Sequence, residues 1–147
     1  MKTYSIKPNE VSRKWHLIDA KDAPLGRIAT QSARLLIGKD KPTFTHHIDG
    51  GDYVVIINAK ELVVTGGKED KKNYWRHSGY PGGLHKRTLT QQMERDPAKV
   101  MIKAIRGMLP VNKLRPGRLA RLKVYADENH QHTAQQPQKI QFKGKKV

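Results

Sequence analysis

The chain has 147 residues, about the length of one domain, and its 29 lysines and arginines against 13 acidic residues give a formal charge of +16. Such a charge is typical of proteins that bind a polyanion, most often a nucleic acid. A membrane surface is the rival polyanion, but no apolar run approaches the ~20 residues of a spanning helix, and residues 1–15 lack the apolar core of a signal peptide. Cysteine is absent, which excludes disulfides and thiolate chemistry and fits a cytoplasmic location.

The first predicted elements are a strand and a helix. Residues 15–20 read as a short buried strand that follows a polar N-terminal arm at 1–13. Pro24 suits the first turn of a helix, where its missing N–H is not needed. Apolar residues then recur at helical spacing up to Leu36, and Gly38 is a natural helix stop. This order predicts the first half of a βαβ unit.

Alternating elements continue along the chain. The continuous apolar run 53–58 predicts a strand covered on both faces, and 62–65 predicts a second short strand stopped by Gly66. Helices are expected around 90–95 and at 97–108, and a final strand near 122–125. The alternation predicts one α/β domain over residues 1–147. Its parts are the arm 1–13, a core at 14–126 that carries a basic loop at 68–87, and an extended polar and basic tail at 127–147.

The charge is concentrated in the second part of the chain. Residues 1–67 carry ten basic and seven acidic residues, whereas 68–147 carry nineteen basic and six acidic ones, so the net charges are +3 and +13. The first part therefore reads as a scaffold and the second as a binding surface.

The segment 68–87 interleaves cations, aromatic rings and glycines. RNA is recognised through phosphates, 2′-hydroxyls and unstacked bases, which stack on aromatic rings and guanidinium planes. The alternative is a flexible basic loop whose rings pack on their own domain, but the surrounding charge favours RNA contact. We therefore expect RNA contacts from Lys68, Lys71, Lys72, Tyr74, Trp75, Arg76, His77, Tyr80, His85, Lys86 and Arg87.

A second basic surface is expected on the helix at 97–108 and on the segment after it. Cations recur there at three- and four-residue spacing, on the side opposite Met101 and Ile105. A charge stripe alone is also typical of a solvated face. However, no acid interrupts the eight basic residues of 99–123. We therefore expect further RNA contacts from Lys99, Lys103, Arg106, Asn112, Lys113, Arg115, Arg118, Arg121 and Lys123.

Seven histidines raise the alternative of a metal site. The best local groups are His46 and His47 with Asp49, and His130 with His132, since imidazole and carboxylate can bind zinc. Neither group has a four-ligand spacing, so we expect no metal.

The sequence also lacks the usual catalytic signatures. Ser78 follows His77 but stands in no G-x-S-x-G elbow. The turn at 19–24 contains neither a glycine fingerprint nor a Walker lysine. A nucleotide-using enzyme on a Rossmann-like sheet is therefore the weaker hypothesis. A free regulator that binds messenger RNA is a second rival, because one basic surface could serve both roles.

Several motifs resemble the bacterial-type family of large-subunit ribosomal protein thirteen. The run 107–114, GMLPVNKL, is the most specific of them, and the resemblance covers nearly the whole chain. The matching stretches are 51–59, 63–66, 76–83, 100–114, 121–125 and 130–135. In the tail the family usually reads His-Pro-His, whereas Gln131 stands here in place of the proline, which leaves the local path of the tail open.

The resemblance implies a three-layer α/β/α domain around a mostly parallel four-stranded sheet. It implies a cytoplasmic structural constituent of the large ribosomal subunit that binds ribosomal RNA and acts early in subunit assembly, next to other large-subunit proteins. It implies neither catalysis nor a cofactor. From the residues themselves, Gly107 is predicted to end the preceding helix with a positive φ, and Pro110 to prevent its resumption. Met108 and Leu109 would then fold back on the apolar side, and Asn112 and Lys113 would face RNA.

Overall fold

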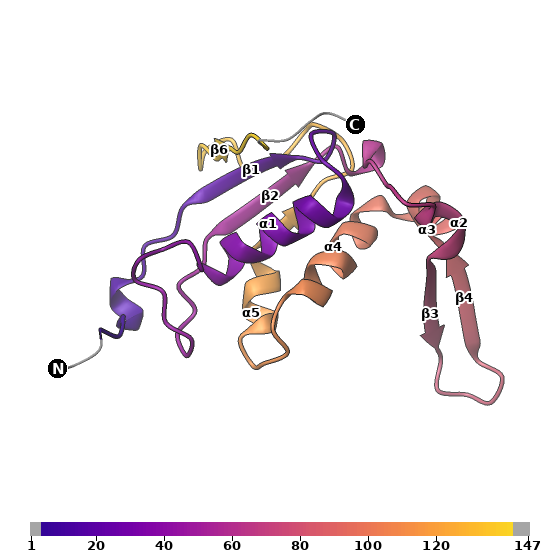
Figure 1. Cartoon of the computed structure of the whole chain (residues 1–147), viewed down its shortest axis with the longest axis horizontal. Coiled ribbons are helices and arrows are strands. Elements are labelled where there is room, and N and C mark those ends of the chain that lie inside the picture. Colours follow the sequence, from indigo (N-terminus) through magenta and orange to yellow (C-terminus); the bar gives the residue numbers. More distant parts are fainter. Residues whose placement is uncertain (1–3, 143–147) are drawn as a thin grey trace.

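The computed structural model describes residues 4–142 and contains one α/β unit with a projecting hairpin (Figure 1). Within these residues no helix is long and apolar enough to cross a membrane. In chain order the elements are η1 (Pro8–Glu10), β1 (Trp15–Asp19), α1 (Leu25–Ile37), β2 (Tyr53–Ile57), η2 (Ala59–Glu61), α2 (Lys68–Lys71), β3 (Asn73–His77), β4 (Leu84–Thr88), α3 (Leu89–Arg95), α4 (Pro97–Met108), α5 (Arg115–Ala120), β5 (Leu122–Val124) and β6 (Gln138–Lys139).

The main sheet has four strands in the order β5-β2-β1-β6, and each pair is parallel. The predicted α/β class with a mostly parallel four-stranded sheet is therefore confirmed. The fourth strand, however, is β6 from the tail and not the stretch 62–65. Val63 makes only an isolated bridge with Pro24, and its carbonyl accepts a hydrogen bond from the amide of Leu25 where α1 begins.

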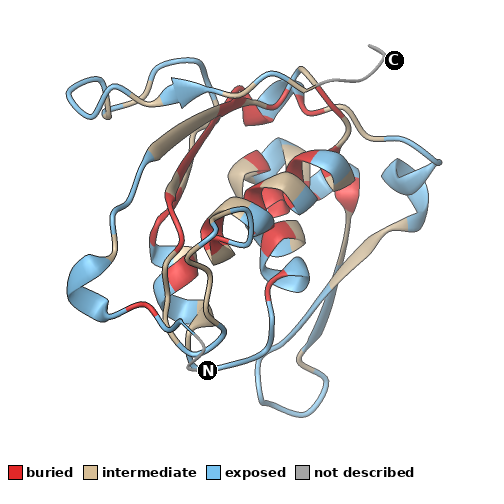
Figure 2. Cartoon of the chain, turned by 60° about the vertical axis from the view of Figure 1, so that its left-hand side comes forward, coloured by how far each residue is buried: buried red, intermediate tan, exposed pale blue. Residues whose placement is uncertain are grey.

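The core lies between the sheet and the helices α1 and α4, which pack side by side on one face (Figure 2). Ile18, Val54 and Ile56 of the sheet are fully buried there, together with Ile28 and Ile105 of the helices. Each such side chain contributes about 1.5–3 kcal/mol by leaving water. The hydrophobic spacing read from the sequence therefore placed the helices correctly.

The other face of the sheet is covered in part by the segment after β5. Trp15 stacks on Tyr53 with ring centroids 4.3 Å apart, and His132 of that segment lies 4.9 Å from Trp15. The hydroxyl of Tyr125 also lies 3.0 Å from Nε2 of His132. These contacts define the path around Gln131 and lead the chain to β6.

The helix ends match the predictions only in part. Gly38 ends α1 in the left-handed conformation, with φ 78°, as predicted, although Pro24 precedes the first helical residue instead of lying in the first turn. The predicted role of Gly107 is wrong, because it lies inside α4 and has no positive φ. The helix ends one residue later since Leu109 is extended, with φ −82° and ψ 143°, as the residue before Pro110 prefers. Leu109 is buried, as expected, whereas Met108 is exposed, contrary to the prediction.

Candidate nucleic-acid interface

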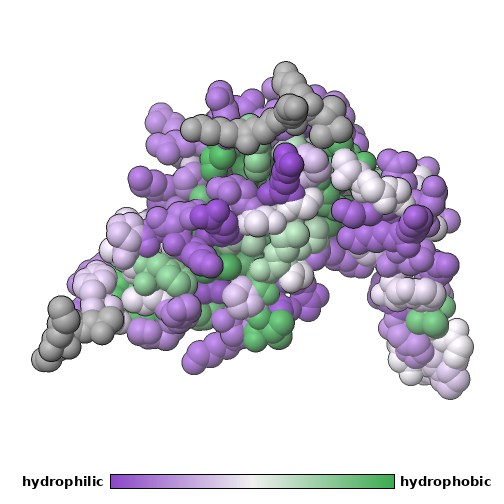
Figure 3. All heavy atoms as spheres, viewed as in Figure 1, coloured by the Kyte–Doolittle hydropathy of each residue, from purple (hydrophilic) through white to green (hydrophobic). Residues whose placement is uncertain are grey.

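The predicted basic loop is in fact a short helix, α2, followed by an antiparallel hairpin, which we call the hairpin arm (residues 73–88). The arm stands away from the body of the protein (Figures 1 and 3). Trp75 and Tyr80 are 57% and 78% exposed on it. More than half of each side chain is therefore open to solvent on a projecting basic hairpin and available to a partner.

Two helix caps follow the arm in the chain. Thr88 ends β4 and caps α3: its hydroxyl accepts from the amide of Gln91, whose side-chain oxygen accepts from the amide of Thr88. Asp96 caps α4 by accepting from the amide of Lys99, with Pro97 as the first helical residue. These local signals set the first residues of α3 and α4, which follow the arm in the chain.

A groove of about 540 Å³ separates the arm from α3 and α4, and we call it the arm groove. None of its lining residues is acidic, although Lys99 is partly neutralised by Asp96 at 3.0 Å. Arginines, lysines and aromatic rings of the arm, α3 and α4 thus converge on one concave surface. The lining residues are Tyr74, Trp75, Arg76, Ser78, His85, Arg87, Gln92, Arg95, Lys99 and Lys103.

Tyr74 forms a half-buried wall of this groove. The amino groups of Lys103 and Lys72 lie 4.7 and 5.4 Å from its ring centroid. Burial raises the pKa of Tyr74, and burial and then the charge of Lys68 lower the pKa of Lys72. The cations are therefore crowded around this ring, which favours a polyanion that would offset their repulsion.

Some of the residues predicted to face RNA lie together around the arm groove, and others lie elsewhere in the structure. Arg95 lines the arm groove but was missed, because it lies between two acids in the sequence, outside the acid-free stretch. Asn112 and Lys113 are exposed in the loop between α4 and α5, and Arg115 donates to the carbonyl of Pro110 at 3.2 Å. Lys123 lies in β5, within the sheet. The remaining predicted residues are on α2 or directly after it, on the arm, or on α4: Lys68, Lys71, Lys72, Trp75, Arg76, His77, Tyr80, His85, Lys86, Arg87 and Arg106.

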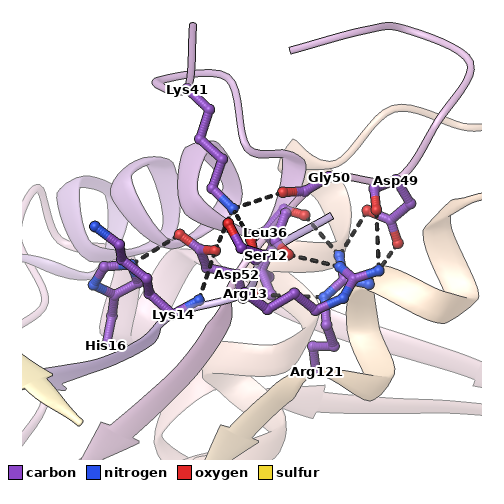
Figure 4. A network of polar contacts seen from close by, with 11 residues as sticks. Ser12, Arg13, Lys14, His16, Leu36, Lys41, Asp49, Gly50, Asp52 and Arg121 are labelled. Carbon is purple, nitrogen blue, oxygen red and sulfur yellow. Dashed lines mark hydrogen bonds and ion pairs between the residues drawn. The ribbon is translucent and has the colours of Figure 1, made fainter. Parts of the chain in front are cut away.

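Arg118 and Arg121 were expected to face RNA, and the structure corrects this. They are only 2% and 7% exposed. Arg121 donates to both carboxylate oxygens of Asp49, at 2.5 and 2.7 Å, and to the carbonyl of Leu36 at 2.9 Å (Figure 4). Nε of Arg118 lies 3.5 Å from the same carboxylate. Both side chains therefore face the interior of the protein and not a partner.

A second carboxylate, Asp52, joins the same network. Nε2 of His16 lies 3.0 Å from one of its oxygens, and the other accepts from Lys41 and from the amide of Lys14. Burial alone would raise the pKa of Asp52, but these hydrogen bonds lower it to about 2. For Asp49, burial is likewise outweighed by Arg121, and its pKa is lowered.

We expect the stability to fall in acid because of Asp52. Its pKa is about 2 when folded against 3.8 for the free group, so the unfolded chain binds protons first as the pH falls. The contribution of Asp52 to the free energy of unfolding, about 2 kcal/mol, is complete above pH 4 and is lost as the pH falls to about 2. Urea unfolding of wild type and Asp52→Asn between pH 6 and 2.5 would measure it, and equal pH dependence in the two proteins would contradict the assignment.

The two histidine groups considered as metal sites have other partners. Nε2 of His47 lies 3.2 Å from the hydroxyl of Ser5, and Asp49 pairs with Arg121. His130 accepts from the amide of His132 at 3.2 Å. Over residues 4–142 no three candidate ligand side chains gather at one point.

The fold and the arm together define a class, that of small basic α/β proteins with a projecting hairpin of cations and aromatic rings. Comparison with known families identifies the member: residues 13–131 match the family model described as ribosomal protein L13. The chain is also 53% identical to the large ribosomal subunit protein uL13 of Kocuria rhizophila over 97% of both chains. It is 51% identical to uL13 of Cupriavidus taiwanensis, over 97% of this chain and all of the relative.

The chain belongs to the ribosomal protein L13 family. This confirms the family that the motifs indicated, which is a family of structural and not enzymatic proteins.

Proposed function

We propose that this protein is a structural constituent of the large ribosomal subunit in the cytoplasm, where it binds ribosomal RNA and supports early subunit assembly beside neighbouring ribosomal proteins. The observation that carries the proposal is the arm groove, where Arg76, Arg87 and Arg95 meet two lysines with no acid in the lining. Guanidinium groups bind phosphates in a fork geometry and stack on bases. The relatives named above are large ribosomal subunit proteins, which fits this chemistry.

The arm supports a particular way of binding. Trp75 and Tyr80 are exposed on a hairpin that already has its fold, so unstacked bases can pack on them without a large cost in ordering. Lys86, whose amino group lies 5.6 Å from the ring centroid of Trp75, supplies a phosphate contact beside that ring. The alternative of a messenger RNA regulator gains no support from the relatives.

Removal of three groove cations should weaken RNA binding more than removal of three other surface cations. The triple variant Arg76→Ala, Arg95→Ala, Lys103→Ala should lower the salt slope of binding to large-subunit ribosomal RNA by about two to three units, since each phosphate contact contributes about one. The matched control replaces Lys7, Lys14 and Lys39, which are exposed and lie outside the groove.

The measurement is binding to a transcript of large-subunit ribosomal RNA between 50 and 300 mM salt (roughly the range over which counterion release is resolved). Equal slopes for the two triple variants would mean that net charge, and not the groove, carries the binding. Sedimentation of cell extract through a gradient tests residence in the particle separately, because a free regulator would not travel with large subunits.

A further inference from the structure

A second hollow lies on the other side of Lys103, between α1, α4 and the start of α2. It measures about 580 Å³. Three glycines, Gly26, Gly66 and Gly107, line it, and we call it the glycine hollow. The other lining residues are Leu25, Lys68, Lys71, Lys72, Lys103, Ala104 and Met108.

Two of these glycines have no structural explanation. Gly26 is the second residue of α1 and Gly107 the last but one of α4, so both have helical backbone, in which glycine is less favourable than alanine, though less so near an end than in the interior. A glycine is usually required by a positive φ or by close packing, but neither residue has a positive φ, and a Cβ at either would meet nothing within 4 Å. Because these two residues have no side chain, the hollow stays open and the helix backbone beside it is uncovered.

The chemistry of the hollow differs from that of the arm groove. Its four cations are all lysines, and its lining holds no acid, arginine, aromatic ring or side-chain amide. Lysine ammonium groups act as point charges toward phosphate, whereas base recognition needs rings, forks or amides. Bare helix backbone permits close approach of a bulky partner, and Leu25, Ala104 and Met108 offer apolar contact to a sugar.

We propose that the glycine hollow receives the sugar–phosphate backbone of RNA without reading its bases, as a site separate from the arm groove. This proposal rests on the proposed function. It assigns different parts of the RNA to two surfaces that meet at Lys103. The arm engages unstacked bases, and the hollow engages the backbone of any sequence. Lys72 and Lys103, which flank Tyr74, connect the two.

The double variant Gly26→Ala, Gly107→Ala separates binding from folding. Because both sites are helical and open, the midpoint of thermal unfolding should stay equal or rise by about 1–3 °C. The two methyl groups occupy the floor of the hollow, so affinity for a large-subunit ribosomal RNA transcript should fall about tenfold. Gly50→Ala is the matched control, since a Cβ there also meets nothing within 4 Å but Gly50 lies outside the hollow.

A second probe, an RNA duplex of unrelated sequence, tests the lack of base reading, and its affinity should fall by the same factor. Unchanged binding of the double variant to both RNAs would overturn the proposal, as would a loss confined to the ribosomal transcript. If polyglutamate of equal charge binds as well as the duplex and suffers the same loss, the hollow suits an acidic protein segment and the RNA assignment is wrong. Failure of the wild-type protein to bind either RNA would instead refute the proposed function.

Discussion

Replacement of Gly51 by alanine should destabilise the protein by more than about 3 kcal/mol, while the same change at Gly50 should leave it nearly as stable as wild type. A Cβ at Gly51 would lie 1.8 Å from the carbonyl oxygen of Leu36 and 2.4 Å from its carbon. Both are backbone atoms of α1, so no side-chain rotation relieves the overlap. The helix would have to move away from the loop that carries Asp49 and Asp52.

Gly50 makes this a controlled experiment, because a Cβ at that residue meets nothing within 4 Å. The two variants differ by one position and by the same methyl group. Urea unfolding at neutral pH measures both free energies. Since the free energy of unfolding of a domain is about 5–15 kcal/mol in total, we expect Gly51→Ala to unfold at low urea. Comparable stability of the two variants would mean that α1 is not held against this loop.

Arg121→Met should cost about 3–5 kcal/mol, because it leaves the Asp49 carboxylate without its main partner and the Leu36 carbonyl without its donor. The methionine keeps most of the side-chain length, so the loss is one of charge and hydrogen bonds. Lys113→Met is the control: Lys113 is exposed, and surface changes of this kind usually fall within about ±0.5 kcal/mol.

The pair can be tested directly by adding Asp49→Asn. If Arg121 and Asp49 stabilise each other, the double variant should lose less stability than the sum of the two single variants, although the buried Arg118 then also loses its carboxylate partner. The free energies of unfolding of the two single variants and the double variant complete the cycle. Strictly additive losses in the free energy of unfolding would show that Arg121 is held by its backbone contacts and not by Asp49.

The sequence by itself determined the local elements and the partition of charge. β1, α1, β2, α4 and β5 lie within one or two residues of the predicted ranges, because hydrophobic spacing, Gly38 and Pro110 act over a few neighbouring residues. The excess of basic residues after residue 67, with a net charge of +13, likewise follows from the sequence alone. These properties depend on residues close together in the chain. They therefore do not depend on how distant segments pack.

Only the tertiary structure decided which groups became partners over long distances. β6 has two residues and no local strand signal; it forms because the free edge of β1 offers hydrogen-bonding groups, and Leu17 accepts from Ile140 there. The stretch 99–123 contains no acid, yet Arg121 is buried against Asp49, 72 residues earlier. A buried carboxylate needs a counter-charge wherever the fold brings one. Whether a cation faces a partner or the protein's own interior is therefore set by the packing of distant segments and not by its neighbours in sequence.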